Sequence, residues 1–469
     1  MRYVKRNALG QAAFIDFPTP LTYSRRLMQQ AARLDVQEFL DRQPFHSFHL
    51  RLGVLCALAV LMDGFDAQAM GFVAPSLLQQ WRISRVALSP ILSSGLVGML
   101  VGALLFGPLG DRLGRKRILV FCTIWFGIGS LLTARVNSVE PMLWLRLVTG
   151  FGLGGAMPNA TALTSEYMPR RLRATGVMLM FFGFSMGAAI GGFVAAGLIS
   201  RYGWQAVFVV GGLLPLVTAI ALVVALPESI RFLQLKGGAE QRVAKLLRKV
   251  APDAPAAAGF MRVEERKAGF PVSQLFTERR TGTTLLLWVI FFMSLLDLYF
   301  LNSWLPTVIH DAGVPLEQAI TITALFQVGG AAAAIVLGRV VDRQMSYSVL
   351  AWVYAGAAIC VFLIGLVSGT VAVETAAVFA AGFCVIGGQT CSNSLAAESY
   401  PTLLRSTGVG WALGIGRIGS IVGPVLGGLL LSFDWGMRRV FLAAAVPAVI
   451  AALAAAALNL TPRRPGSLQ

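Results

Sequence analysis

The chain has 469 residues and a mean hydropathy of +0.71, with 56% hydrophobic and 13% charged residues. Folding as one or two soluble domains is excluded, because a soluble protein cannot hide so much apolar surface, and the composition indicates many membrane spans. The net charge of +17 is spread over many loops, which argues against nucleic-acid binding, where basic residues gather in one soluble domain.

Residues 1–49 are expected to form a cytoplasmic N-terminal segment, because they hold no apolar core long enough for a signal peptide. The stretch 35–41 predicts a short amphipathic helix that lies at the inner membrane interface, with Val36, Phe39 and Leu40 turned to lipid. Residues 1–27, directly before Met28, are either a dispensable extension or the product of an upstream start, and both alternatives stay open.

Twelve apolar stretches then follow, each close to the roughly 20 residues that a spanning helix needs. The predicted fold is an all-α membrane protein with two pseudo-symmetric six-helix bundles, 50–226 and 282–460, a central loop at 227–281 and a tail at 461–469. The predicted spans are 50–74, 88–109, 117–136, 141–165, 174–199, 204–226, 282–305, 318–341, 347–368, 373–396, 406–431 and 438–460.

Sequence similarity between the halves supports this division. The segment from Glu166 to Gly176 matches the segment from Glu398 to Gly408 in its Glu, Pro, Leu, Arg, Thr and Gly residues. Such a repeat in an apolar chain is typical of a transporter in which one half rocks against the other around a central site. Two more matches occur in the same order, 107–112 with 338–343 and Asp63 with Asp297.

The distribution of Lys and Arg predicts the orientation in the membrane. These residues are concentrated after the second and fourth spans and in the central loop, where 239–248 also predicts a surface helix. Because Lys and Arg bias short loops to the cytoplasm, we expect both termini and the central loop to lie on the cytoplasmic side of the inner membrane.

Two motifs carry a resemblance to a known family. The run from Gly107 to Arg117 (GPLGDRLGRKR) resembles the loop 2–3 signature of the major facilitator superfamily, and the run from Arg146 to Gly154 resembles its span 4 signature. The resemblance narrows to the aromatic acid:proton symporter family at Asp63-Gly-Phe-Asp66, Pro158-Asn159, Glu166, Gly416-Arg417-Ile-Gly419 and Gly423-Pro424. It implies a midplane cavity between two bundles and uptake of aromatic carboxylates together with protons. We expect no cofactor, and we expect the protein to work as a monomer.

The first span contains the predicted proton-coupling group. Asp63 and Asp66 share one helix face, and two carboxylates this close cannot both ionise cheaply, so we expect one of them to carry a proton. Arg146 in the fourth span lies near the depth of Asp66, and a pair between them would break on protonation. We place Glu166 in the same group. The alternatives are that both aspartates are structural and that Arg146 extends to the outer interface.

Arg417 is the predicted anchor for a substrate carboxylate. It lies near the middle of the eleventh span, where a guanidinium needs an anion and can hold a carboxylate through two parallel hydrogen bonds. Asp297 is expected to supply that charge when no substrate is bound; the alternative is that the two residues pair permanently. Further candidates are five amides for polar contacts, which are costly to bury in lipid without a partner: Asn159, Asn302, Gln327, Gln389 and Asn393. Aromatic rings are candidates for stacking, and each of them can instead be a packing residue: Phe65, Phe184, Tyr299 and Trp304.

Charged residues at equivalent cytoplasmic loops predict two inter-helix clusters that act as gates. The alternative is that these charges only determine topology. The first cluster is expected to contain Asp111, Arg112, Arg115, Glu166 and Arg173, and the second Asp342, Arg343, Glu398 and Arg405.

The sequence therefore predicts a proton-coupled importer of a small aromatic carboxylate. Alternatives are an exporter of organic anions or drugs by proton exchange, and a non-transporting receptor on a carrier scaffold. Import is favoured because 187–192 lacks the glycine-proline signature of many drug exporters. No Ser-His, Cys-His or metal-ligand pattern occurs in the spans, so neither an enzyme nor a metal site is expected.

Overall fold

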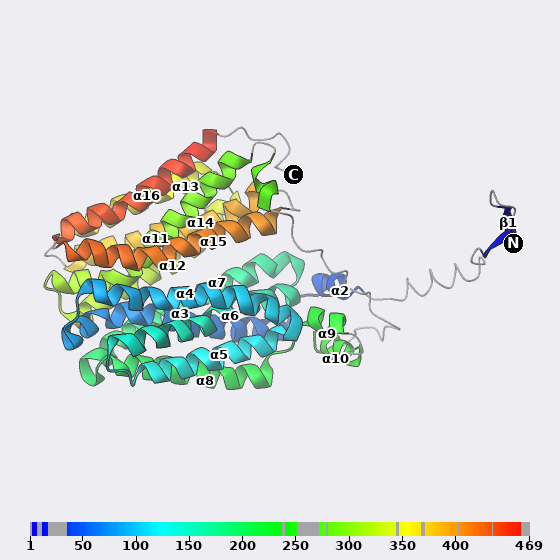
Figure 1. The fold of residues 1–469 in the computed structure, drawn as a ribbon, viewed down its shortest axis with the longest axis horizontal. Helices are drawn as coiled ribbons and strands as arrows, with labels where there is room; N and C mark the ends of the chain where they lie inside the picture. Colours follow the sequence, from blue (N-terminus) through cyan, green and yellow to red (C-terminus); the bar gives the residue numbers. More distant parts are fainter. Residues whose placement is uncertain are drawn as a thin grey trace.

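The computed structural model describes residues 2–6, 12–16, 35–236, 240–250, 272–277, 280–343, 347–366, 371–400, 404–433 and 435–460. Near the amino terminus, strands β1 (Arg2–Arg6) and β2 (Ala12–Asp16) pair antiparallel. This hairpin is not among the elements expected from the sequence. The other described elements are helices, and the long ones run side by side in two groups (Figure 1).

Each half of the chain contributes six long helices. The largest difference from the predicted spans is at the end of α3, which continues beyond residue 74 to Trp81, because Pro75 lies inside the helix and does not end it. The helices are α3 (Ser47–Trp81), α4 (Arg85–Leu113), α5 (Arg115–Thr133), α6 (Val139–Tyr167), α7 (Arg173–Tyr202), α8 (Gln205–Ala225), α11 (Thr281–Asp311), α12 (Leu316–Arg343), α13 (Tyr347–Leu366), α14 (Val371–Ser399), α15 (Arg405–Ser432) and α16 (Met437–Leu460).

Eleven of these helices in the described part are long and apolar enough to cross a membrane. The twelfth is α6, which has 29 residues but carries Arg146 and several glycines. It packs against α4, α5 and α3. Because protein surrounds much of this helix, it can tolerate more polar residues than a helix that faces lipid.

Glycines let equivalent helix pairs touch in the two halves. A Cβ atom at Gly150 of α6 would lie 2.0 Å from the Gly95 carbonyl oxygen of α4. In the second half, a Cβ atom at Gly382 of α14 would lie 1.9 Å from the Phe326 carbonyl oxygen of α12. These are the second and fourth long helices of each half, so the packing follows the sequence repeat. Small residues are what allow such close backbone contact between membrane helices.

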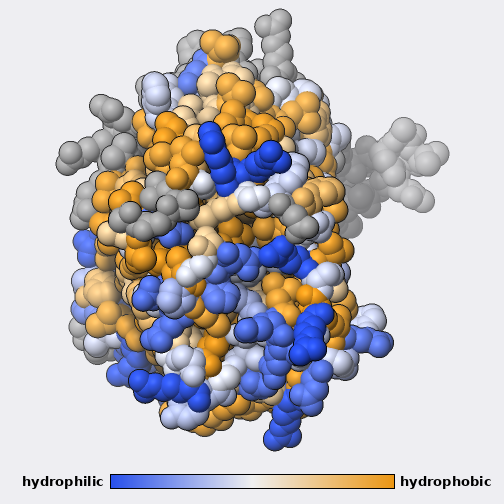
Figure 2. All heavy atoms as spheres, turned by 90° about the vertical axis from the view of Figure 1, so that its left-hand side faces the viewer, coloured by the Kyte–Doolittle hydropathy of each residue, from blue (hydrophilic) through white to orange (hydrophobic). Residues whose placement is uncertain are grey.

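The two ends of the bundle differ. One end carries α2 (Val36–Arg42), α9 (Ile230–Lys236) and α10 (Glu240–Val250), and we call it the α10 end (right in Figure 1). The other end, where α3 finishes, we call the Trp81 end. Figure 2 looks onto the Trp81 end and shows hydrophilic residues across its face among hydrophobic ones.

The two halves are joined at the Trp81 end. Arg85 Nη2 of α4 donates to Asp311 Oδ2 of α11 at 2.6 Å, and Gln68 Nε2 of α3 donates to the Asn302 carbonyl oxygen at 2.9 Å. A single hydrophobic core runs across both halves here and includes Phe72 and Trp304. Towards the α10 end, the buried core residues form two separate clusters, one in each half. The structure is therefore closed at the Trp81 end.

The predicted amphipathic helix exists as α2, but its predicted lipid contact is wrong. Val36 and Leu40 are 1% and 0% exposed and join the core of the first half, which also includes Val243 of α10. The Asp41 carboxylate pairs with Arg173 at 2.5 Å. The helix turns its apolar face inward because protein, rather than lipid, lies against it. The predicted helix in the central loop is confirmed as α10.

Candidate functional site at the centre of the bundle

Asp66 of α3 and Arg146 of α6 form a buried ion pair, as their depth in the two spans predicts. Arg146 Nη2 donates to Asp66 Oδ2 at 2.8 Å, and Nη1 donates to Oδ1 at 3.3 Å. The two side chains are 0% and 3% exposed, so Arg146 does not extend to the membrane surface. Two parallel bonds between a guanidinium and a carboxylate give a strong and directional contact.

Small and aromatic neighbours make room for the Arg146 guanidinium. A Cβ atom at Gly95 of α4 would lie 3.8 Å from its Nη2 atom, and the Phe208 ring centroid of α8 lies 5.6 Å from its Cζ atom. A cation over an aromatic face is attracted by the ring. The Nε atom has no hydrogen-bond partner among the described residues. The arginine therefore depends mainly on Asp66 to balance its charge.

Asp63 lies about one helical turn from Asp66 and is fully buried. Neither carboxylate oxygen has a hydrogen-bond partner in the described part of the chain. The charges of Arg417 and Asp66 both act on it. Burying a carboxylate without hydrogen bonds is costly when the group is charged. Asp63 is thus a buried carboxylate with no hydrogen bond in the described part of the chain, and it lies within electrostatic reach of both Asp66 and Arg417.

Arg417 of α15 is half-buried, and its Nη1 atom lies 3.5 Å from the Tyr299 hydroxyl of α11. The predicted pair with Asp297 is absent, and among the described residues Arg417 has no ion pair at all. Asp297 lies in the second half near Tyr354, and its Oδ1 atom has no partner among those residues. The guanidinium is therefore available to an external carboxylate.

The predicted amides divide into three groups. Asn302 Oδ1 accepts from Gln327 Nε2 at 2.9 Å, near the contact between the halves. Gln389 Nε2 donates to Asn393 Oδ1 at 3.2 Å, and Asn393 is exposed. Asn159 instead donates to two backbone carbonyls, at Phe106 and Gly155, and fills the space left by Gly110. Its amide nitrogen holds α4 against α6.

The predicted aromatic residues also differ in their surroundings. Trp304 is fully buried and its Nε1 donates to the Pro424 carbonyl oxygen at 2.9 Å. Phe65 is buried against Gly191 and Gly211 of the first half, and Phe184 is half-buried beside α3. Tyr299 is also half-buried and accompanies Arg417. Its hydroxyl places this ring beside the Arg417 guanidinium.

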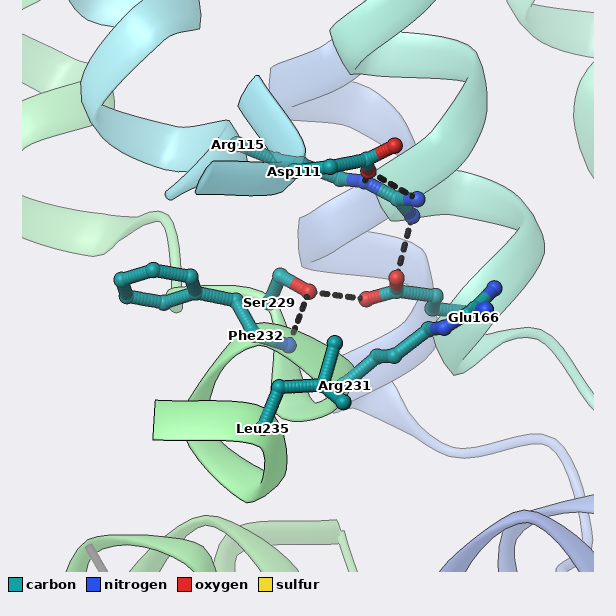
Figure 3. Close-up of a pocket in the computed structure, with 7 residues that line it drawn as sticks. All are labelled: Asp111, Arg115, Glu166, Ser229, Arg231, Phe232 and Leu235. Carbon is teal, nitrogen blue, oxygen red and sulfur yellow. Dashed lines mark hydrogen bonds and ion pairs between the residues drawn. The ribbon is translucent and has the colours of Figure 1, made fainter. Parts of the chain in front are cut away.

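A separate charge cluster lies at the α10 end (Figure 3). Arg115 sits between Asp111, at 2.7 Å, and Glu166, and Ser229 Oγ donates to the other Glu166 oxygen at 2.7 Å. A cavity of about 210 Å³ opens beside them. The inter-helix cluster predicted for the first half is confirmed for Asp111, Arg115 and Glu166.

The cluster differs from the prediction in its other members. Arg112 is exposed, and Arg173 pairs with Asp41 rather than with Glu166. Glu166 comes 20 residues after Arg146 in α6, which is about 30 Å along a helix, so it is remote from Asp66. Ser229 was missed, because nothing in its spacing indicates that the chain after α8 returns to the end of α6.

The equivalent cluster of the second half is not seen in the described part. The side chains of Asp342 and Arg343, in the last turn of α12, lie outside the described residues. Glu398 and Arg405 are exposed, and neither forms an ion pair with another described residue. Likewise, no group of three or more His, Cys, Asp or Glu side chains within the described ranges is placed to hold a metal ion.

Comparison with known proteins identifies the family. The family description "Major Facilitator Superfamily" matches residues 56–421 and 287–469. The chain belongs to this superfamily. Its relatives include a 4-hydroxybenzoate transporter, PcaK, from Pseudomonas aeruginosa, 45% identical over 425 residues, which are 90% of this chain and 95% of the relative. A gallate transporter from Pseudomonas putida is 44% identical over 426 residues, 90% of this chain and 94% of the relative.

Solved structures of superfamily transporters share the fold. The xylose transporter XylE from E. coli, in an inward open conformation, gives a TM-score of 0.70 at 19% identity and covers 89% of this chain and 97% of its own. A bacterial homologue of the lysosomal transporter Spinster, inward-facing and occupied, gives 0.69 at 15% identity, with 90% and 100% covered. The predicted fold of two six-helix bundles is confirmed, and the named relatives are transporters rather than enzymes.

Proposed function

We propose that this membrane protein imports a small aromatic carboxylate together with protons, by alternating access between its two halves. The observation that carries the proposal is the 45% identity, over 90% of the chain, to a transporter named for 4-hydroxybenzoate. The half-buried Arg417 beside Tyr299 supports it, because this pair offers a carboxylate anchor next to an aromatic ring. We propose that the protein works as a monomer in the inner membrane.

The bundles 50–226 and 282–460 are the proposed moving bodies. We place the α10 end, both termini and the central loop in the cytoplasm, because Lys and Arg are concentrated there. With this orientation, the closed Trp81 end faces outward. The contacts of Arg85 with Asp311 and of Gln68 with Asn302 would then break when the carrier opens to the outside.

Asp66, Asp63 and Arg146 are the proposed coupling residues. Protonation of Asp66 removes the charge that balances Arg146, so the pair breaks and the helices α3 and α6 can shift. The charges of both Asp66 and Arg417 act on Asp63. A proton and a substrate carboxylate can thus influence each other through charges at the centre of the bundle. Asp297, Asn302, Gln327, Gln389 and Asn393 are proposed to line the substrate path, with Phe65, Tyr299 and Trp304 forming its apolar walls.

The proposal is tested by uptake of radiolabelled aromatic acids into proteoliposomes, with and without an inward proton gradient. We expect accumulation of at least one hydroxybenzoate or related acid only when the gradient is present. Liposomes without protein and liposomes treated with a protonophore serve as controls. Gradient-driven efflux of unrelated compounds, with no accumulation of any acid, would instead make the protein an exporter.

The charge cluster around Glu166 is proposed to prepare the α10 end for closure. Its observed members belong to α4, α5 and α6 of the first half and, through Ser229, to the segment just before α9, so the cluster holds the end of α4 that carries Asp111 and Arg112. Glu166→Gln is expected to slow transport about tenfold, because it weakens hydrogen bonds to a charged group, while the dissociation constant of the substrate stays unchanged. Glu140→Gln, at the exposed start of the same helix, is the control and should leave the rate as it is. Equal rates for both variants would contradict this role.

A further inference from the structure

A second pocket lies at the α10 end, away from the central site, between the start of α5 and the helices α9 and α10. Its volume is about 400 Å³, and Glu228 is the one carboxylate among its lining residues. We call it the basic pocket, because six cationic side chains line it: Lys116, Arg117, Lys236, Arg242, Lys245 and Lys249.

The protein balances only part of the positive charge of the basic pocket, because a single carboxylate, Glu228, acts on Lys116 while six cations line the pocket. Glu228 Oε1 accepts from the backbone N–H groups of Lys116 and Ser229, at 2.9 Å each. Lys249 lies close enough to Lys116 for their charges to repel. None of the six cations forms an ion pair with another described residue. Like charges held together in this way attract an anion.

An exposed apolar stripe leads from the membrane surface of α8 to the basic pocket. Lys116 Nζ donates to the Val223 carbonyl oxygen at 2.8 Å, so the pocket adjoins the last turn of α8. Exposed side chains of a membrane span face acyl chains. Residues three and four apart along α8 form this stripe, namely Leu213, Val217, Ile220 and Val224, which are 51%, 64%, 66% and 80% exposed.

We propose that the basic pocket binds the phosphate headgroup of an anionic membrane phospholipid, whose acyl chains lie along the stripe of α8. A phosphate offers several oxygens to Lys and Arg donors, and basic pockets beside membrane helices suit such headgroups. A free phosphate ion would use the same cations but not the stripe. The continuity between pocket and stripe therefore favours a lipid. This site is distinct from the transport site and does not depend on the transported substrate.

The test measures how phosphatidylglycerol with a fluorescent acyl chain binds to the detergent-solubilised full chain. The triple variant Arg242→Gln, Lys245→Gln, Lys249→Gln is expected to bind about a hundredfold more weakly, roughly fivefold for each charge. The matched control, Arg51→Gln, Arg170→Gln, Arg171→Gln, removes three exposed cations from the same end and should bind as wild type does. Lys245→Arg with Lys249→Arg retains the charge and should also bind normally, which separates charge from folding.

Competitors distinguish the two sources of phosphate. Unlabelled phosphatidylglycerol should displace the probe, whereas inorganic phosphate and glycerol phosphate at the same concentration should not. Displacement by inorganic phosphate at that concentration would assign the pocket to a free anion and overturn the lipid proposal. Equal losses in both triple variants, or equal affinity for phosphatidylcholine, would also overturn it, because binding would then follow net charge or apolar surface alone.

Discussion

Replacing Asp66 by Asn is expected to reduce proton-driven accumulation of substrate at least about a hundredfold. Exchange of substrate across the liposome membrane, measured without a gradient, should continue. The neutral amide of Asn cannot bind and release a proton. It also carries no negative charge, so the positive charge of Arg146 stays unbalanced in every state of the carrier. Breaking a buried ion pair by removing one partner costs about 3–5 kcal/mol, which also corresponds to more than a hundredfold in a conformational equilibrium. Accumulation and exchange are measured with the same radiolabelled acid.

A double variant separates coupling from stability in this experiment. Asp66→Asn alone leaves the buried Arg146 charge without its partner, so its thermal unfolding temperature should fall. Asp66→Asn with Arg146→Gln removes both charges and should recover much of that stability, but it should not recover accumulation. If the double variant accumulates substrate against a gradient, the pair is structural and another group carries the proton.

Arg417→Ala is expected to raise the dissociation constant for the aromatic acid about a hundredfold or more. Each hydrogen bond to a charged group is worth about 1.5–3 kcal/mol, and a planar guanidinium can make two to one carboxylate. Arg417→Lys retains the charge but loses the paired geometry, so its dissociation constant should lie between those of wild type and Arg417→Ala. Tyr299→Phe should have a smaller effect, because the hydroxyl lies 3.5 Å from Nη1. Equilibrium binding to the purified protein gives these values.

A neutral ligand serves as the control for Arg417. The methyl ester of the same acid has no carboxylate, so its weak binding should be equal in wild type and in Arg417→Ala. Arg439→Ala, which removes an exposed arginine of α16, should leave the affinity for the acid unchanged. If the ester and the acid lose affinity equally in Arg417→Ala, the arginine supports the shape of the cavity and does not bind the carboxylate.

The sequence by itself determined the twelve helices, their division into two halves and the pair of Asp66 with Arg146. Hydrocarbon thickness sets the length of a span, so apolar runs define the helices directly. The repeat predicted two pseudo-symmetric bundles, and equivalent glycine contacts, of α4 with α6 and of α12 with α14, occur in the two halves. The pair was predictable because two opposite charges at one depth inside a bundle need each other.

Only the tertiary structure decided which neighbours the other polar residues meet. Arg417 contacts Tyr299 and not Asp297, and the Asn159 amide donates to the backbone carbonyls of Phe106 and Gly155. The depth of a residue along its span does not reveal how far the helix is rotated about its axis. This rotation determines which neighbour the side chain contacts. In the same way, α2 has the pattern of a lipid-bound helix, but protein covers its apolar face, because lipid and a protein core select the same hydrophobic periodicity.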